Sequence, residues 1–459
     1  MRNKFIIFIF SALILVGAGC TGGSTVRLTP ITLQYWRIDD DPAAMQPMID
    51  AYRKIHPNIT IAYTRLRADE YERKLLEALA ENRGPDLFSI ASPELGEWRD
   101  RVRPLPKETT IPTQTVNAQK QIVTTNKKSA TLSLLDVRKN FVEDATNTIV
   151  KFDQPDPEKP GENKIFGLPL SFDTLAMFYN KDLLRKANIE KPPATWKDVE
   201  DQSKKLTVLD KDNVTVKQSG AALGGAGNVL YSTDILTAIM MQNGADMTDD
   251  GGYPRFNVYS ASTSARLFPP GVEAVMFYQG FANANTPTYT WNENMAISLD
   301  AFVAGKVAIF FGYPVDMQKI RDRAPKLDFA IAPLPQIDPS RPKNVPNFPI
   351  EVVSKKTAHP NEAWDFLQFA TSKEQVSDWL TATKRPTALR ALIQQQLTDP
   401  DLAPFAGQLL TANSWYDGKD WSKVQKAFNT LILSRPTFDH PEFQPLINQA
   451  ADAVSATIF

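Results

Sequence analysis

The residue types best suited to catalysis are scarce in this sequence and poorly placed for it. The 459 residues include one cysteine and three histidines, and each histidine precedes a proline: His56, His359 and His440. A histidine before proline is typical of a turn, and these three have no metal-ligand spacing. Neither the G-x-S-x-G nor the H-E-x-x-H pattern occurs. We therefore expect no catalytic histidine, no bound metal and no cofactor.

Carboxylates offer two further kinds of chemistry. The stretch DMTDDG at residues 246–251 begins like a calcium loop, but Thr248 stands at its third position and Asn257 at its twelfth, where a bidentate glutamate belongs. A tight turn is the better interpretation. A carboxylate pair for glycoside hydrolysis is defined by distance and leaves no sequence pattern, so a cell-surface enzyme acting on polysaccharide stays open as an alternative. Our prediction is that the protein is not an enzyme.

The single cysteine has a different chemical setting. Arg2 and Lys4 are followed by the apolar run FIIFIFSALILVG, and small residues lead directly to Cys20. The run is shorter than the roughly 20 residues of a membrane-spanning helix, and the pattern is that of a secretory signal peptide over residues 1–19. It resembles a bacterial lipobox, in which the cysteine is lipidated and begins the mature chain. The alternative is an ordinary signal peptide with an incidental cysteine.

A lipid on Cys20 would fix where the protein works. Residues 20–30 would then be the lipidated cysteine and a flexible tether, and the mature chain would have no other thiol for a disulfide. Two or more acyl chains hold a protein firmly at a membrane. We therefore expect a lipid anchor and a body on the extracytoplasmic face of the cell membrane, at the cell surface or in the periplasm.

Charge and length limit what the body can be. At a soft prior of about 150 residues per domain, the remaining chain suggests two or three domains. Lysine and arginine number 51 against 52 for aspartate and glutamate, so there is no basic footprint for nucleic acid. No second apolar stretch is long enough to span a membrane.

Strand and helix patterns alternate from the start of the body. Strands are predicted at 31–36, 59–66 and 86–91, and helices at 42–57 and 69–82. Parallel strands require crossover helices, so this order predicts an α/β fold with a parallel sheet. A second series begins near residue 165, with a helix that starts at a capping box formed by Thr195 and Asp198. The C-terminal third is mostly helical in pattern.

Longer segments resemble one family. YRKIHPNITIAYTRLRADEYERKLLEALAENRGPDLFSI resembles the first lobe of the family 1 extracellular solute-binding proteins, which serve ABC importers. GLPLSFDTLAMFYNKDLLRKANIEKPPATWKDV is similar to the most recognisable block of that family. AFVAGKVAIFFGYP, IAPLPQ and AWDFLQFATSKEQVSDWL follow in the family's order, so the resemblance runs from about residue 31 to residue 430. It implies a two-lobed periplasmic-binding-protein-like fold, each lobe a mainly parallel sheet flanked by helices, with a ligand cleft between the lobes.

The resemblance also implies that each lobe is discontinuous in sequence. The helix-glycine-strand element AFVAGKVAIFFGYP would return the chain to the first lobe. We therefore expect the first lobe at residues 31–145 plus 302–345, and the second lobe at residues 146–301 plus 346–459.

Sugar chemistry and the resemblance together suggest binding residues. A sugar presents apolar C–H faces and many hydroxyls, so its site needs flat aromatic rings and polar groups. In open α/β sheets these groups follow the carboxyl ends of strands. Asp173 and Trp415 stand where the maltose-binding protein, a member of this family, has a ligand-contacting carboxylate and a stacking ring. The candidate ligand-binding residues are Trp36, Arg37, Asp39, Asp40, Ser89, Ser92, Asp173, Tyr231, Ser232, Thr233, Gly312, Tyr313, Trp415 and Tyr416.

Several candidates have structural alternatives. Trp36 could pack in a core, and Asp173 could cap a helix that begins at Thr174. Arg37 could bind an anionic solute as well as a hydroxyl group. The segment NVPNFPIEVVSKKTAHP also lacks the glycines that many sugar binders have there. A receptor for a non-sugar polar solute is therefore an alternative.

These observations predict a membrane-anchored receptor. It would close its lobes over a small polar solute, a sugar or oligosaccharide, and deliver it to the transmembrane subunits of an ABC permease. We expect it to act as a monomer without a nucleic-acid partner. A lipoprotein that kept the fold but lost its ligand is a further alternative, for which a cleft filled by its own side chains would be the sign.

Overall fold

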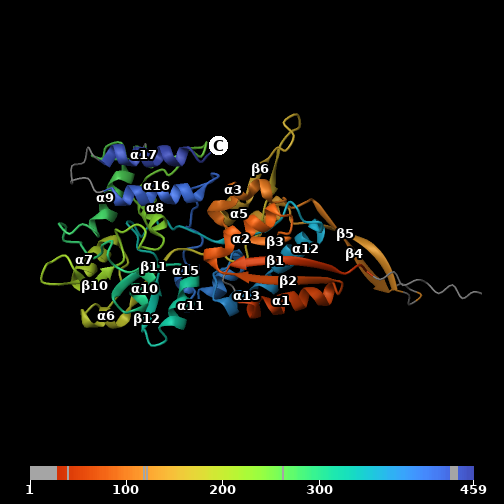
Figure 1. Cartoon of the computed structure of the whole chain (residues 1–459), viewed down its shortest axis with the longest axis horizontal. Coiled ribbons are helices and arrows are strands. Elements are labelled where there is room, and N and C mark those ends of the chain that lie inside the picture. The colour runs from red at the N-terminus through yellow and green to blue at the C-terminus, as the bar shows by residue number, and fades with distance from the viewer. Residues whose placement is uncertain are drawn as a thin grey trace, which may run out of the picture.

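A computed structural model describes residues 28–38, 41–116, 119, 122–260, 263–434 and 443–458. Figure 1 shows two lobes side by side, and each has its own apolar core. The predicted signal peptide, Cys20, most of the tether, Asp39 and Asp40 lie outside the described residues. Within the described part of the chain, no helix combines the length and apolar character that a membrane span requires.

The first lobe, on the right of Figure 1, is built on a four-stranded sheet of order β13-β3-β1-β2. Strand β1 runs parallel to β2 and β3, whereas β13 is antiparallel to β3. The strands are β1 Ile31–Ile38, β2 Ile59–Leu66, β3 Leu87–Ala91 and β13 Pro349–Val353. The predicted parallel strands are confirmed, because α1 and α2 supply the crossovers between them.

Helix α1 (Pro42–Ile55) illustrates how the helices of this lobe cover the sheet. Its buried residues are Met45, Met48, Ile49 and Tyr52, which form one stripe at helical spacing. The other helices are α2 Ala68–Ala80, α3 Leu95–Trp98, α4 Leu134–Asn140, α5 Glu143–Ile149, α12 Pro360–Ala370, α13 Lys373–Thr383 and α14 Ile393–Gln396, with the short 3-10 helices η1 Ser92–Glu94, η2 Arg99–Arg101 and η3 Arg390–Leu392. Trp364 and Trp379, on α12 and α13, lie in the first core.

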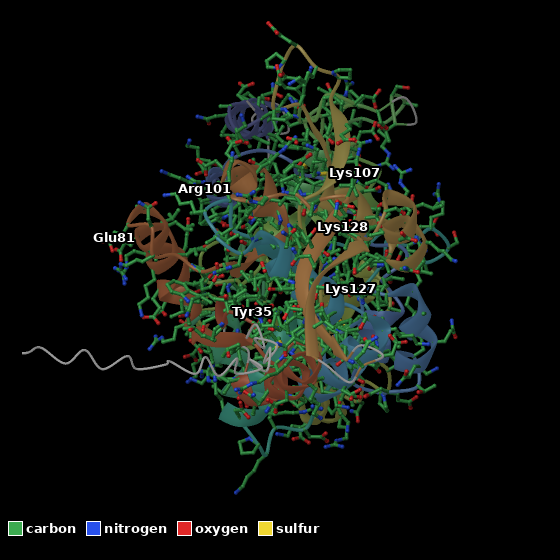
Figure 2. All side chains as sticks on the ribbon, turned by 90° about the vertical axis from the view of Figure 1, so that its right-hand side faces the viewer. Tyr35, Glu81, Arg101, Lys107, Lys127 and Lys128 are labelled. Carbon is green, nitrogen blue, oxygen red and sulfur yellow. The ribbon has the colours of Figure 1, made fainter. Side chains whose placement is uncertain are left out.

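Two hairpins extend the first lobe. The longer one, β4 (Glu108–Val116) with β5 (Ile122–Ala130), is antiparallel and projects from the body in Figure 1. Figure 2 views the molecule from that side, with Lys107, Lys127 and Lys128 labelled along the ribbon. The shorter hairpin, β6 (Val150–Asp153) with β7 (Glu162–Ile165), holds a proline-containing polar segment at its turn. The sequence patterns did not predict the longer hairpin.

The second lobe contains a five-stranded sheet of order β12-β8-β11-β10-β9. Only the β10–β11 pair is parallel, so this sheet is mixed and not mainly parallel as expected. Strand β8 is antiparallel to both of its neighbours, β11 and β12. The strands are β8 Ala176–Asn180, β9 Val208–Leu209, β10 Val216–Ala221, β11 Val307–Gly312 and β12 Phe329–Ala332.

Helix α7 (Trp196–Leu206) of the second lobe begins as the sequence predicts. The Asp198 amide donates to the Thr195 hydroxyl at 3.1 Å, and the Thr195 amide donates to the Asp198 carboxylate at 2.9 Å. Trp196 then packs in the second core. The other helices of this lobe are α6 Lys181–Lys186, α8 Ser232–Gln242, α9 Pro270–Gly280, α10 Ser298–Val303, α11 Pro314–Arg323, α15 Ala403–Ala406, α16 Trp421–Leu433 and α17 Phe443–Ser455.

The sheets correct the expected lobe boundaries. Strand β11 was expected in the first lobe but pairs with β8 and β10 of the second sheet, and β13 was expected in the second lobe but pairs with β3. Residues 146–173, also expected in the second lobe, contribute to the first core. Gly305, with a φ of 68°, turns α10 straight back into β11 within one lobe. The chain therefore changes core after Phe172, after Val345 and again between Phe405 and Tyr416.

The segments judged unpromising for metal chemistry form turns. His56 ends α1, and in DMTDDG the Asp249 carboxylate accepts hydrogen bonds from the amides of Gly251 and Tyr253. Among the described residues, no group of histidine, cysteine, aspartate and glutamate side chains is arranged to hold a metal ion.

Candidate ligand site between the lobes

The three crossings between the lobes lie together and form a hinge. The Leu175 amide donates to the Val345 carbonyl and the Asn347 amide donates to the Asp173 carbonyl, each at 3.0 Å. The third crossing joins the same region through a β-bridge between Ala412 and Asn344. A few loop residues that cross between two packed lobes are the usual site of domain closure. The candidate site lies beside this hinge.

The space next to the hinge is lined by both lobes. Ser92 comes from the first lobe, Asp234 from the second, Asn347 from the hinge, and Trp415 and Tyr416 follow the third crossing. Three of these residues, Ser92, Trp415 and Tyr416, belong to the candidate set. The cavity measures about 20 Å³, which is room for about one water molecule. The space in this arrangement of the lobes is too small for a solute larger than water.

A buried cluster of tyrosines and aspartates stands on the second-lobe side. The Tyr313 hydroxyl donates to the Asp234 carboxylate at 2.8 Å, and the Tyr313 amide donates to the Asp316 carboxylate at 3.0 Å. The Tyr231 ring meets the Tyr313 ring edge to face, with centroids 4.8 Å apart. Tyr231 holds a left-handed φ of 60°, a strained backbone conformation of the kind found at functional sites.

Burial controls the protonation of this cluster. It raises the pKa of Asp234 to about 6, although Tyr313 and Asn347 donate hydrogen bonds that favour the ionised form. Burial also raises the pKa of Tyr231 and of Tyr313 well above the ordinary value, so both phenols stay neutral. At neutral pH the cluster therefore combines a mostly ionised Asp234 with neutral phenols, and the Tyr313 phenol donates to that carboxylate.

Asp173 lies at the first crossing and is held by an arginine. No helix begins at Thr174, so the alternative of a helix cap is wrong. The Asp173 carboxylate instead forms a buried ion pair with Arg385 of the first lobe. Its charge also acts on Tyr313, which places it beside the cluster.

Arg37 and Ser89 lie in the first core, away from the expected ligand contacts. The Glu351 carboxylate accepts hydrogen bonds from Arg37 and Tyr35, each at 2.6 Å, and from the Ser89 hydroxyl at 2.8 Å. The Arg37 guanidinium lies 5.2 Å from the Trp379 ring centroid and is 1% exposed. The alternation of β1 turns Tyr35 and Arg37 to the buried face of the sheet. Their role is to join β1, β3 and β13.

Four other candidates have structural neighbours. Trp36 is half-buried and packs against the first core, while Thr233 is buried at the start of α8. The Ser232 hydroxyl donates to a side chain of α16 at 3.2 Å. A Cβ at Gly312 would lie 2.9 Å from the Asp316 carboxylate, so glycine leaves room for that side chain.

Sequence reasoning missed residues that complete the site. Asp234 directly follows the candidate run Tyr231–Thr233, and Asp316 lies three positions after Tyr313, so a wider window around the candidates would have included both. Asn347 and Arg385 carry no such signal, because folding alone brings them next to Asp234 and Asp173.

Comparison with known families agrees with this architecture. The sequence profile of the bacterial extracellular solute-binding proteins matches residues 36–377. The chain belongs to this family. As the family description states, its members bind solutes outside the cytoplasm.

Individual relatives are more distant. A binding protein of Brucella abortus (strain 2308) is 23% identical over 54% of this chain and 57% of its own length. The maltodextrin-binding protein of Bacillus subtilis (strain 168) is 28% identical over 46% of this chain and 47% of its own. The chain thus spans about half the length of these two relatives.

Solved structures resemble the whole molecule. An ABC substrate-binding protein from Listeria monocytogenes in complex with cycloalternan has a TM-score of 0.68 at 18% identity, covering 93% of this chain and 98% of that one. A cyclo/maltodextrin-binding protein complexed with maltotetraose has a TM-score of 0.65 at 18% identity, covering 94% and 98%. These matches establish the two-lobed fold.

Proposed function

We propose that this solute-binding protein is a lipid-anchored receptor that captures a sugar or oligosaccharide between its lobes and delivers it to the permease of an ABC importer. The observation that carries the proposal is the cluster beside the hinge. The second lobe supplies the Asp234 carboxylate, the Tyr416 phenol and the Trp415 indole to this space, and the first lobe supplies Ser92.

The side chains suit a carbohydrate in two respects. Asp234 lines the space and can accept hydrogen bonds from sugar hydroxyls, and a carboxylate makes stronger bonds than a neutral acceptor. Trp415 offers a flat apolar face, and its ring is held by Phe256 and Phe428, with centroids 6.2 and 5.8 Å away. The relatives named for maltodextrin and cycloalternan support the same ligand class.

Lobe movement supplies the mechanism. Because the space holds about one water molecule, the crossings must rotate to admit a ligand and rotate back to enclose it. The closed form would be the one that the permease recognises. The ligand shifts this equilibrium only by the difference between its affinities for the closed and open forms.

The test is thermal unfolding of a soluble version that begins at Thr21, with a panel of sugars and other polar solutes. A ligand at 100 times its dissociation constant should stabilise the folded form by about 2.7 kcal/mol. Chromatography of the recovered solute separates a receptor, which returns it intact, from an enzyme acting on polysaccharide. Stabilisation by phosphates, peptides or polyols alone would contradict the sugar assignment.

A matched pair of variants locates the binding. Asp234→Asn should weaken sugar binding about 10- to 100-fold, since a hydrogen bond to a charged group contributes roughly 1.5–3 kcal/mol. Asp452→Asn makes the same change at an exposed position of α17 and should leave the affinity for sugar unaltered. Equal affinities in the two variants would place the ligand elsewhere.

A further inference from the structure

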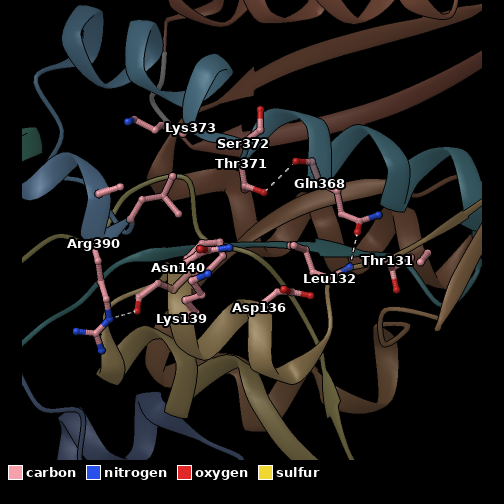
Figure 3. A pocket seen from close by; sticks show the side chains of 14 residues that line it. Thr131, Leu132, Asp136, Lys139, Asn140, Gln368, Thr371, Ser372, Lys373 and Arg390 are labelled. Carbon is pink, nitrogen blue, oxygen red and sulfur yellow. Dashed lines mark hydrogen bonds between the residues drawn. The ribbon is translucent and has the colours of Figure 1, made fainter.

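A second cavity lies on the first lobe alone, away from the hinge. We call it the first-lobe groove; it measures about 900 Å³ and is shown in Figure 3. Its walls come from segment 130–132, helix α4, the junction of α12 and α13, and η3. Its size is in the range of small-molecule sites, roughly 300–1,000 Å³.

The groove carries an excess of positive charge. Its lining includes three cations, Lys139, Lys373 and Arg390, and one carboxylate, Asp136. That carboxylate is already used at the start of α4, where it accepts from the Ser133 amide at 2.9 Å and from the Ser133 hydroxyl at 2.6 Å. Among the described residues, none of the three cations forms an ion pair.

A neighbouring groove on the same lobe differs from the first-lobe groove in the pairing of its cations. It measures about 780 Å³ and shares the wall at residues 130–132. Its two lysines are both paired: Lys107 with Glu162 at 3.1 Å, and Lys164 with Asp153 at 2.8 Å. The first-lobe groove therefore differs from its neighbour in charge, with similar size and a common wall.

Two of the cations differ in how local structure treats them: it disfavours Lys373 and fixes Arg390 in place. Lys373 stands in the first turn of α13, the positive end of the helix dipole, where a cation is unfavourable by several tenths of a kcal/mol. The Arg390 Nε donates to the Phe141 carbonyl at 2.7 Å, which fixes the side chain and leaves its two terminal nitrogens available. Figure 3 shows Lys373 at the upper end and Arg390 at the lower end of the groove.

We propose that the first-lobe groove binds a phosphate monoester with an organic body. Near pH 7 such a group carries a charge of roughly −1.5 to −2, which balances the excess of two positive charges. Arginine can bind two phosphate oxygens at once, and lysines act as point charges. Leu132, Phe141 and Leu389 supply apolar walls for the body of the ligand. The site is independent of the interlobe ligand.

The proposal is tested on the soluble chain by calorimetric titration. The probes are glucose 6-phosphate, glycerol 3-phosphate, inorganic phosphate and glucose, together with vesicles of phosphatidylcholine with and without phosphatidic acid. We expect the organic phosphates to bind more tightly than inorganic phosphate, and glucose not to compete. Binding of the soluble esters identifies a free ligand, whereas binding only of phosphatidic acid vesicles identifies a lipid head group.

Variants connect the binding to the groove. The triple variant Lys139→Gln, Lys373→Gln, Arg390→Gln should weaken binding by at least about 10-fold, because it removes all three charges. A control triple on exposed positions of the second lobe, Lys186→Gln, Lys205→Gln, Lys426→Gln, should bind as the parent does. Arg390→Lys keeps the charge but loses the two-oxygen geometry, so its loss should be smaller than that of the triple variant.

Three results would overturn the proposal. One is no binding of any phosphate probe by the parent chain. Another is an equal loss in the groove and control triples, which would indicate a diffuse charge effect. The third is equal affinity for inorganic phosphate and the esters, which would remove the role assigned to the apolar walls.

Discussion

At the scale of single residues, Asp234 links the chemistry of the candidate site to the stability of the fold. It is buried, accepts the Tyr313 hydroxyl, and has a pKa raised to about 6 by burial. A carboxylate in the unfolded chain has a pKa near 3.9. Between these two values the folded form binds more protons, so stability is present below the lower value and is lost as the pH rises through the higher one.

We expect Asp234→Asn to remove this part of the pH dependence. The raised pKa of Asp234 corresponds to about 3 kcal/mol in the free energy of unfolding. As the pH rises from 4 to above 6, the variant should become more stable than the parent by this amount. Urea unfolding of both proteins at several pH values in this window measures the difference. Stability curves that stay parallel from pH 4 to 7 would contradict the assignment of a raised pKa to Asp234.

Arg37 and Glu351 allow a test of a structural role against a binding role. Glu351→Ala leaves the Arg37 charge buried without its carboxylate, and breaking a buried ion pair in this way costs about 3–5 kcal/mol. The free energy of unfolding of the first lobe, measured with urea, should fall by that amount. Arg37→Met combined with Glu351→Leu should be less destabilised than Glu351→Ala alone. If Arg37→Met abolished ligand binding without loss of stability, Arg37 would be a ligand contact.

At the scale of elements, helix α3 forms a seam with the loop that follows the third crossing. A Cβ on Gly96 would lie 2.2 Å from the Gly418 carbonyl oxygen, so the two segments meet through glycine. Nearby, the Asp144 carboxylate accepts from the Ser414 amide and hydroxyl, each at 2.7 Å. Lys151 also pairs with Asp417 across the seam at 2.8 Å. These contacts hold the lobes together.

We expect Gly96→Ala to favour separated lobes, because the added methyl group overlaps backbone that has no room to move aside. Small-angle X-ray scattering should show a larger radius of gyration without ligand, and sugar affinity should fall. Gly227→Ala is the matched control, since a Cβ there meets nothing within 4 Å. A scattering curve for Gly96→Ala that matches the control would mean that α3 does not limit closure.

At the scale of the whole molecule, the proposed receptor needs two separate features: a hinge that lets the lobes move and an N-terminal segment that anchors the protein. The three crossings allow the lobes to move, while β1, the first strand of the body, starts at Ile31, shortly after the proposed anchor at Cys20. Cys20→Ser should release the protein from cell membranes into the soluble fraction, as measured by fractionation. Sugar affinity of the purified variant should equal that of the soluble chain. Retention at the membrane would contradict lipidation of Cys20.

The order of elements could be read from the sequence because it depends on local patterns. The strand predicted at 59–66 coincides with β2, and the Thr195 capping box begins α7 as expected. The lobe boundaries could not be read in this way. The local sequence of β11 and of the α10–Gly305 segment before it does not show which sheet the strand joins. Only the pairing of β11 with β8 and β10 places it in the second lobe.

The residues of the candidate site also separate into those that the sequence predicts and those that only the tertiary structure reveals. The sequence by itself determined the alternation of strands and helices, the family, and the candidates Ser92, Tyr231, Tyr313, Trp415 and Tyr416 near the junction of the lobes. Tertiary structure alone decided that Arg37 and Ser89 belong to the core and that Arg385 and Asn347 reach the hinge. The physical reason is that strand register and the three crossings, which act over hundreds of residues, determine which polar groups are buried together.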